Sequence, residues 1–163
     1  MCLHYGRRVW DSTLQAMIFV GIDPGASGAV AFLPSNGNPW FVYNKDSLRD
    51  LAEEVVTASR DNVVVAMIEI VHSSPQMGVK SAFTFGQSYG RLEAVFIALG
   101  IVIERVRPAA WQKAMQCMTK GDKNITKAKA QELFPNTKIT HANADALLIA
   151  EYSRRNQYLT CGS

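Results

Sequence analysis

The order of short apolar segments predicts an α/β fold with a mixed five-stranded sheet. Three β-rich segments follow one another near the N-terminus, separated only by turn signals, which is typical of an antiparallel meander. Further along, helical and strand patterns alternate, as they do where parallel strands are joined by helices. The 163 residues, 48% hydrophobic and 19% charged, suffice for one domain with a buried core. We therefore expect a three-strand meander extended by parallel strands and flanked by helices.

The meander is predicted over residues 17–22, 28–33 and 40–43. The turn Asp23-Pro24-Gly25 ends the first of these strands, and a Ser-Asn-Gly-Asn-Pro stretch at residues 35–39 separates the second from the third. Both turns are short, so the three strands should pair with their sequence neighbours.

The middle of the chain is predicted to contain two helices and a central strand. Residues 47–59 are amphipathic, and residues 63–70 form a near-continuous apolar run typical of a strand covered on both faces. Residues 80–99 form the second helix, on which small residues recur every fourth position. These residues are Ala82, Gly86, Gly90, Ala94 and Ala98. Such a stripe permits close approach either of a second copy of the chain or of the chain's own sheet.

The remaining segments complete the alternation. A strand is predicted at residues 101–106, followed by a short helix at residues 108–118 and a basic loop at residues 119–124. Thr126 is expected to cap a helix that ends at Phe134, before a proline.

A last helix is predicted to begin near Thr140 and to run past Ala150. We assign residues 17–158 to one domain, residues 1–16 to an N-terminal appendage and residues 159–163 to a C-terminal tail.

The composition argues against several classes of protein. Cys2, Cys117 and Cys161 form neither a CxxC pair nor an even set, so a disulfide framework or a structural zinc site is not expected. No apolar run approaches the roughly 20 residues of a membrane span, so we predict no membrane partner. Free thiols are typical of a cytoplasmic protein of a bacterial or phage-infected cell, with an organelle as the alternative location.

Positive charge is concentrated in the second half of the chain. The net charge is +3, but from Arg105 onward ten basic residues stand against four acidic ones. An asymmetry of this kind within one small domain favours a polyanionic partner.

Acidic residues stand where apolar strands end. Asp23 follows the first strand, Glu69 lies near the end of the central strand, and Asp145 interrupts the apolar start of the last helix, with His141 one turn before it. Each has an ordinary explanation when taken alone: a turn cap for Asp23, a solvent-facing strand end for Glu69, and a helical pair for the other two. If the two strands are neighbours and the last helix crosses their ends, all four converge. Oxygen ligands with open positions suit Mg²⁺ or Mn²⁺.

Three stretches carry a resemblance to a known family. They are residues 21–29 (GIDPGASGA), residues 69–75 (EIVHSSP) with Gly78, and residues 141–150 (HANADALLIA). The sequence resembles the RuvC-like Holliday junction resolvases of the RNase H-like superfamily, especially the phage and plant-plastid branch. The resemblance extends from residue 17 to about residue 155.

The resemblance implies a tetrad of Asp23, Glu69, His141 and Asp145 that binds two Mg²⁺ ions per active site, with Mn²⁺ as a substitute. Asp23 would bridge both ions, Glu69 and Asp145 would each help to hold one, and His141 would ligate an ion or orient the attacking water. The plastid-type pattern has a His four residues before the final acidic residue, as here. That branch usually has Gly and Arg between them, where this chain has Ala142 and Asn143, so the role of Asn143 stays open.

The resemblance also implies a homodimer that binds branched DNA and nicks two strands of a four-way junction symmetrically. The lysines at 113 and 127 stand where the family carries phosphate-binding lysines, and the loop after Glu69 would enter the junction centre. Met77 or Phe83 would act there as an apolar wedge, or either belongs to the core. The predicted DNA-binding residues are Arg107, Lys113, Lys120, Lys123, Lys127, His72 and Met77; Lys129 and Lys138 fit a solvated face.

We therefore predict a Mg²⁺-dependent endodeoxyribonuclease that leaves 5′-phosphate and 3′-hydroxyl ends. The alternatives are a general RNase H-like nuclease or transposase-type core, and a non-catalytic junction-binding architectural protein. A nucleotide cofactor is not expected. Actin-like ATPases need a duplicated domain, and the glycines at 25 and 28 lead into a strand rather than the helix of a dinucleotide-binding fold.

Overall fold

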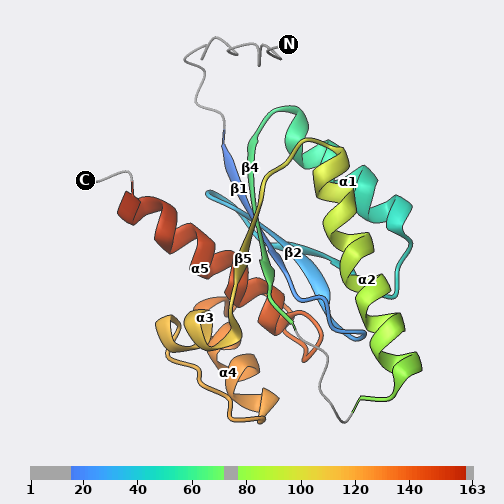
Figure 1. The fold of residues 1–163 in the computed structure, drawn as a ribbon. Coiled ribbons are helices and arrows are strands. Elements are labelled where there is room, and N and C mark those ends of the chain that lie inside the picture. The colour runs from blue at the N-terminus through green and yellow to red at the C-terminus, as the bar shows by residue number, and fades with distance from the viewer. Residues whose placement is uncertain (1–15, 72–76, 161–163) are drawn as a thin grey trace.

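The computed structural model describes residues 16–71 and 77–160. Five strands form one sheet in the order β3-β2-β1-β4-β5 (Figure 1). The antiparallel meander joins β1 to β2 and β2 to β3, whereas β4 lies parallel to β1, and β5 parallel to β4. The strands are β1 (Met17–Ile22), β2 (Ala29–Pro34), β3 (Trp40–Tyr43), β4 (Val63–Glu69) and β5 (Ile103–Val106). The predicted mixed five-stranded sheet is confirmed.

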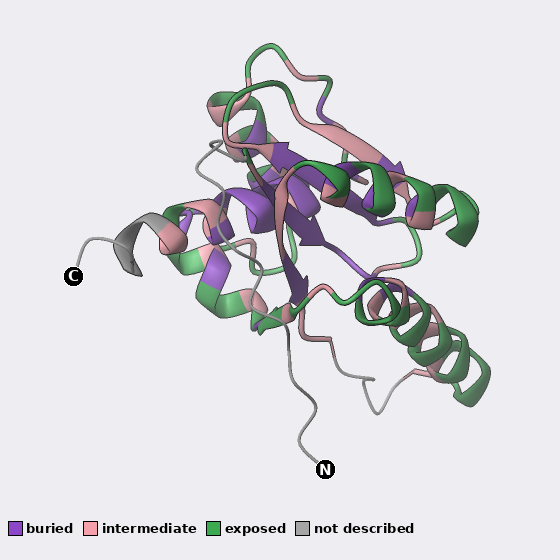
Figure 2. Ribbon diagram, turned by 90° about the horizontal axis from the view of Figure 1, so that it is seen from above, coloured by how far each residue is buried: buried purple, intermediate pink, exposed green. Residues whose placement is uncertain are grey.

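Helices cover both faces of this sheet, as Figure 1 shows. They are α1 (Leu48–Arg60), α2 (Val79–Ala98), α3 (Pro108–Ala114), α4 (Lys123–Leu133) and α5 (Ala144–Thr160). Alternate strand residues supply two cores: Val20 packs in the cluster that includes α1 and α2, and Phe19 in the cluster that includes α3, α4 and α5. Figure 2 shows largely buried strands between helices whose outer faces are exposed. No helix in the described residues is long and apolar enough to cross a membrane.

Two helix starts differ from the sequence-based prediction. The basic loop is shorter than expected, because the Asp122 side chain accepts a hydrogen bond from the Asn124 amide and α4 begins at Lys123. The prediction that Thr126 caps this helix is wrong: its hydroxyl lies inside the first turn and donates to the Lys123 carbonyl. Lys123 is therefore the first residue of α4, and the helix sets the direction of its side chain.

The last helix also begins later than predicted. Its first residue is Ala144, and His141 lies in the preceding turn. The Asn143 side chain accepts a hydrogen bond from the Thr140 amide at 2.7 Å, which closes this turn before the helix starts.

The small-residue stripe on α2 does not pack on the chain's own sheet. Of its five residues only Ala82 is partly buried, and a Cβ added at Gly86 or Gly90 would meet nothing within 4 Å. The helix turns Leu92 and Phe96 toward the sheet instead. Packing against the chain's own sheet, one of the two expectations for the stripe, is thus wrong.

Close contact between α5 and β1 depends on Gly21. A Cβ at this position would overlap the Ala146 carbonyl oxygen and the Ala150 amide nitrogen, both backbone atoms of α5. Only glycine permits this approach. The contact brings the first turn of α5, which carries Asp145, to the end of β1.

Candidate active site

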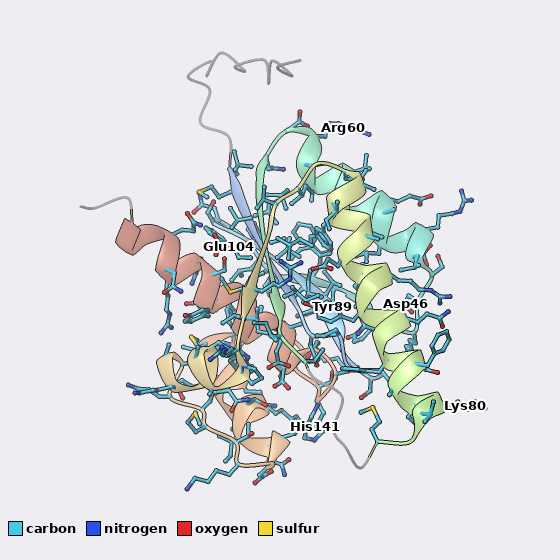
Figure 3. All side chains as sticks on the ribbon, viewed as in Figure 1. Asp46, Arg60, Lys80, Tyr89, Glu104 and His141 are labelled. Atoms are coloured by element: carbon cyan, nitrogen blue, oxygen red, sulfur yellow. The ribbon has the colours of Figure 1, made fainter. Side chains whose placement is uncertain are left out.

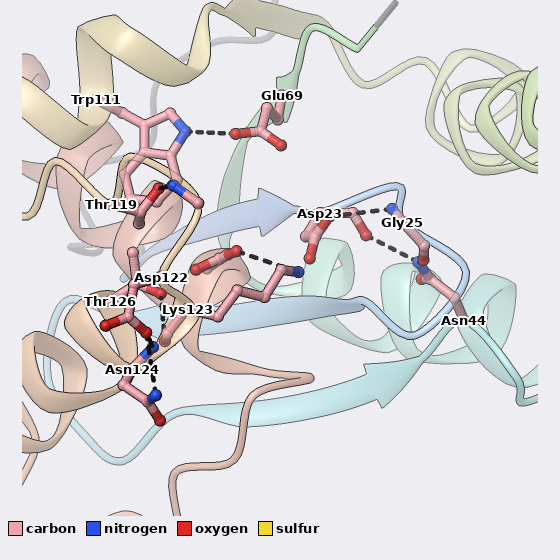
Figure 4. A network of polar contacts seen from close by, with 12 residues as sticks. Asp23, Gly25, Asn44, Glu69, Trp111, Thr119, Asp122, Lys123, Asn124 and Thr126 are labelled. Carbon is pink, nitrogen blue, oxygen red and sulfur yellow. Dashed lines mark hydrogen bonds and ion pairs between the residues drawn. The ribbon is translucent and has the colours of Figure 1, made fainter. Parts of the chain in front are cut away.

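Asp23 is held in a tight turn directly after β1. Its carboxylate accepts a hydrogen bond from the Gly25 amide at 3.0 Å, and its own amide donates to the Ala29 carbonyl. The Asn44 side-chain amide donates to the carbonyls of Asp23 and Gly25, at 2.8 and 2.7 Å (Figure 4). A Cβ at Gly28 would lie 2.8 Å from the Asp23 Cγ, so any larger residue there would displace the carboxylate. The turn therefore fixes the carboxylate of Asp23, a residue that is only 6% exposed.

Glu69 stands beside Asp23 because β1 and β4 are parallel neighbours. Ile22 pairs with Ile68, so the next residue of each strand leaves the sheet at the same level. The Glu69 carboxylate accepts a hydrogen bond from the Trp111 indole nitrogen at 2.8 Å (Figure 4). Trp111 is fully buried in α3, so it fixes the direction in which the half-buried carboxylate points.

Asp145 reaches the same place from the first turn of α5. Its Oδ2 lies 3.8 Å from the Lys123 Nζ of α4, and its side chain is 14% exposed. Its Oδ1 is buried and has no hydrogen-bond partner within the described residues. In Figure 4 the Lys123 side chain extends from α4 toward Asp23.

The electrostatics of the site favour a bound cation. Burial raises the pKa of Glu69 to about 7; the Trp111 hydrogen bond opposes this, while the charges of Asp23 and Asp145 add to it. Burial also raises the pKa of Asp23, with the Gly25 amide opposing and the Asp145 charge adding. Lys123 lowers both pKa values. Three carboxylates therefore repel one another where water reaches them poorly, and a divalent cation would relieve this repulsion.

The raised pKa of Glu69 predicts a specific pH dependence of stability. The folded protein keeps this proton between about pH 4.5 and 7, where the unfolded chain has released it. The contribution of Glu69 to stability therefore falls as pH rises through this window. Above it, the buried charge exerts its full cost. We expect the melting temperature of Glu69→Gln, minus that of the wild type, to increase from pH 5 to pH 8 when both are measured in chelator.

Glu53→Gln is the matched control, because Glu53 is exposed on α1. Its difference from the wild type should stay nearly constant over the same pH range. A Glu69→Gln difference that stays flat or shrinks with pH would contradict the assigned pKa of Glu69.

The donor set suits a hard divalent ion, although the side chains are not arranged around one. Across the described part of the chain, no group of three or more His, Cys, Asp or Glu side chains could hold a metal ion as it stands. Within the described residues, the buried Oδ1 of Asp145 nevertheless lacks the hydrogen-bond partner that buried polar atoms normally have, and a cation could take that place. Three carboxylates from neighbouring elements are the ligand type that Mg²⁺ prefers. The residues present therefore fit the ion.

Among the described residues, no polar contact joins His141 to the three carboxylates. Its side chain is exposed in the turn before α5, at the opposite end of the molecule from Arg60 (Figure 3). Within the described residues, it makes no hydrogen bond or ion pair with Asp23, Glu69 or Asp145. Its role as a ligand stays a prediction.

The basic residues predicted to bind DNA lie on three segments: α3 with its N-cap, the loop that follows, and α4. Arg107 is the N-cap of α3, Lys113 is exposed on that helix, and Lys120 lies in the loop before α4. Lys123 and Lys127 are both on α4. The set thus gathers on and between α3 and α4.

The residues predicted to enter the junction centre have different positions. His72 lies outside the described residues. Met77 precedes α2 and lines a cavity of about 850 Å³ that also borders Ala26 of the Asp23 turn. Phe83 is 69% exposed on α2, so the expectation that it belongs to the core is wrong.

Sequence reasoning missed two residues that hold the site. The Trp111 indole donates a hydrogen bond to the Glu69 carboxylate, 42 positions away in the sequence. The Asn44 amide donates to the Asp23 carbonyl, 21 positions away. A buried indole N–H needs an acceptor, and this was the one available signal for Trp111. No local pattern identified its partner.

The sheet order, together with the helices on both faces, defines an RNase H-like fold of the RuvC type. Among 23 matching chains of solved structures are two of RuvC from Thermus thermophilus. The first, in complex with a Holliday junction substrate, has a TM-score of 0.59 at 15% identity; the match covers 89% of this chain and 96% of that one. The second has a TM-score of 0.54 at 17% identity, covering 88% and 97%. No family model matches the chain, and no curated protein matches it significantly. At these identities the likeness establishes the fold.

Proposed function

We propose that this protein is a metal-dependent, structure-selective DNA endonuclease that resolves four-way junctions by symmetric paired nicks. The observation that carries the proposal is the meeting of Asp23, Glu69 and Asp145 at one end of the sheet, beside the Lys123 ammonium. The RuvC-type fold supports it, because one neighbour with this fold was crystallised on a Holliday junction.

Asp23, Glu69 and Asp145 would hold two Mg²⁺ ions, for which Mn²⁺ substitutes, and His141 would serve as a further ligand or orient the attacking water. When bound, such ions lower the pKa of water and offset negative charge on a phosphodiester. Trp111 keeps the Glu69 carboxylate pointing into the site, and the Gly25 amide does the same for Asp23. The products would carry 5′-phosphate and 3′-hydroxyl ends.

Lys123 places a positive charge where the scissile phosphate must bind. Its ammonium lies 3.8 Å from Asp145, and its charge also acts on Asp23 and Glu69. Together with the other basic residues of α3 and α4, it would contact DNA phosphates. Such contacts position the backbone without reading sequence and make binding strongly salt-dependent.

The spacing of His141 and Asp145 supports the phage and plant-plastid branch as the nearest type. The His stands four residues before the acidic residue, as in the plastid-type pattern. In the structure these residues lie on a turn and on the helix that follows it. A ligand role for His141 requires the turn to bring its side chain toward Asp145.

We further propose a homodimer formed through α2. The outer face of this helix combines the exposed stripe of small residues with exposed apolar side chains, namely Val79, Phe83 and Ile97. An apolar helix face of this kind on a small domain is typical of an interface. Two-fold symmetry would place two active sites on opposed strands of a symmetric junction.

Replacing Gly90 by Gln tests this interface. In the monomer a Cβ at position 90 meets nothing within 4 Å. Replacing this helical glycine by glutamine should stabilise the helix by roughly 0.5–1 kcal/mol. In the dimer the same side chain would separate the two helices. We expect sedimentation to give a dimer for the wild type and a monomer for Gly90→Gln, whose melting temperature at low protein concentration is unchanged or higher. A wild-type monomer that still makes paired nicks would contradict the dimer.

The proposal is tested by incubating the protein with a labelled four-way junction and, separately, with a linear duplex of the same arms. Paired nicks in the junction alone would support a resolvase. Cleavage of both substrates would favour a general RNase H-like nuclease. Tight junction binding with no cleavage under any divalent metal would favour an architectural protein.

A further inference from the structure

Asn143 uses its buried amide to shape the loop before α5. Its side chain is fully buried; the Oδ1 accepts from the Thr140 amide at 2.7 Å, and the Nδ2 donates to the Lys138 carbonyl at 3.1 Å. The Nδ2 also lies 3.4 Å from the Tyr43 hydroxyl at the end of β3. A buried, multiply bonded amide of this kind holds its partners in one arrangement. Asn143 therefore attaches the segment from Lys138 to Thr140 to the edge of the sheet.

The attached segment forms one wall of a cavity of about 570 Å³. Ser27 and Gly28 of the Asp23 turn form a second wall, and Tyr43 and Lys45 a third. A Cβ at Gly28 would lie 2.9 Å from the Asp23 Oδ2, so this wall directly adjoins the catalytic carboxylate proposed above. The cavity shares Ala26 with the cavity that Met77 and α2 line, but its other lining residues are different.

Residues that line this cavity carry side-chain groups without the partners that a phosphate would supply. Lys45 and Lys138 are exposed, and among the described residues neither forms an ion pair; Lys45 Nζ lies 5.7 Å from the centre of the Tyr43 ring. The Thr140 hydroxyl oxygen is buried and, within the described residues, has no hydrogen-bond partner. Two positive charges and an unused hydroxyl suit a phosphodiester anion. Lys129, by contrast, pairs with Glu132 at 2.8 Å.

We propose that this cavity is a second phosphate site, which holds the backbone of the DNA strand next to the scissile phosphate. Lys45 and Lys138 bind the phosphate, and the buried Thr140 hydroxyl donates to it once its side chain rotates toward the cavity. Asn143 is a positioning residue that keeps Lys138 and Thr140 in place. The inference rests on the proposed DNA endonuclease and adds contacts to the same strand. It also gives a function to Lys138, a residue that was predicted from the sequence to lie on a solvated face.

The test is the salt dependence of junction binding by the full chain, measured as fluorescence anisotropy of a labelled four-way junction in chelator. Each phosphate contact that is lost should reduce the slope of log affinity against log salt by roughly 0.7–0.9. We expect Lys45→Ala and Lys138→Ala each to lose about this much. Thr140→Val removes no charge, so it should weaken binding and leave the slope unchanged.

Arg60→Ala is the matched control for charge. Arg60 is exposed at the opposite end of the molecule from His141, and its removal should alter neither slope nor affinity (Figure 3). Lysine variants with the wild-type slope, in a protein that binds the junction, would overturn this site alone. A wild-type protein that does not bind the junction would overturn the proposed function together with the site.

Discussion

Replacing Asp23 by Asn is expected to lower the rate of junction cleavage by roughly 10³-fold or more, because the site then loses several kcal/mol of metal-dependent stabilisation of the transition state. The amide has the same shape and still accepts a hydrogen bond from the Gly25 amide. Burial disfavours the Asp23 charge, so its removal should not destabilise the fold. Junction binding in chelator should therefore stay within about twofold of the wild type, since phosphate contacts from basic residues supply most of the affinity.

Asp61→Asn is the matched control for this substitution. Asp61 is an exposed carboxylate that follows α1, and the exchange removes the same charge. Its cleavage rate should equal that of the wild type. An Asp23→Asn protein that cleaves normally would show that the catalytic site lies elsewhere.

Replacing Gly21 by Ala should destabilise the protein by about 3 kcal/mol or more, the upper part of the usual range for overpacking. The added Cβ overlaps two backbone atoms of α5, and backbone atoms of a packed helix have no side-chain rotation with which to avoid it. The helix must move away from β1, and Asp145 moves with it. We expect a lower midpoint in urea unfolding and, in the fraction that remains folded, reduced cleavage.

Gly78→Ala provides the comparison. A Cβ at Gly78 meets nothing within 4 Å, and its backbone is extended at the N-cap of α2. Because alanine is a poorer N-cap residue than glycine, the exchange should cost about 1 kcal/mol or less. If Gly21→Ala is no more destabilising than Gly78→Ala, the close approach of α5 to β1 is not what positions Asp145.

The strands could be predicted from sequence because each carries its own local signal. Residues 17–22 and 40–43 were predicted with the bounds that the structure has, since turn residues mark their ends. The meeting of Asp23 and Glu69 was predicted only on the condition that their two strands are neighbours, and the parallel pairing of β1 with β4 meets that condition. Helix starts were harder, since Asp122 and Thr126 are both good caps and the choice between them depends on packing.

Contacts between distant side chains had no such signal. The hydrogen bond from Trp111 to Glu69 and the ion pair of Lys123 with Asp145 exist only once α3, α4 and α5 have packed on one face of the sheet. The direction of the α2 stripe was likewise open, because a row of small residues has no preference between a sheet and a second helix. Asn143 departs from the pattern of the resembled family, and its three hydrogen-bond partners, which only the folded chain brings together, account for its place in the loop.

Metal-dependent junction resolution is tested by comparing cleavage of a labelled four-way junction with that of a linear duplex of the same arms, in Mg²⁺ and in chelator. We expect paired, symmetric nicks in the junction in Mg²⁺, no nicks in the duplex, and no cleavage of either in chelator. Cleavage that persists in chelator, or equal cleavage of junction and duplex, would contradict a metal-dependent junction resolvase.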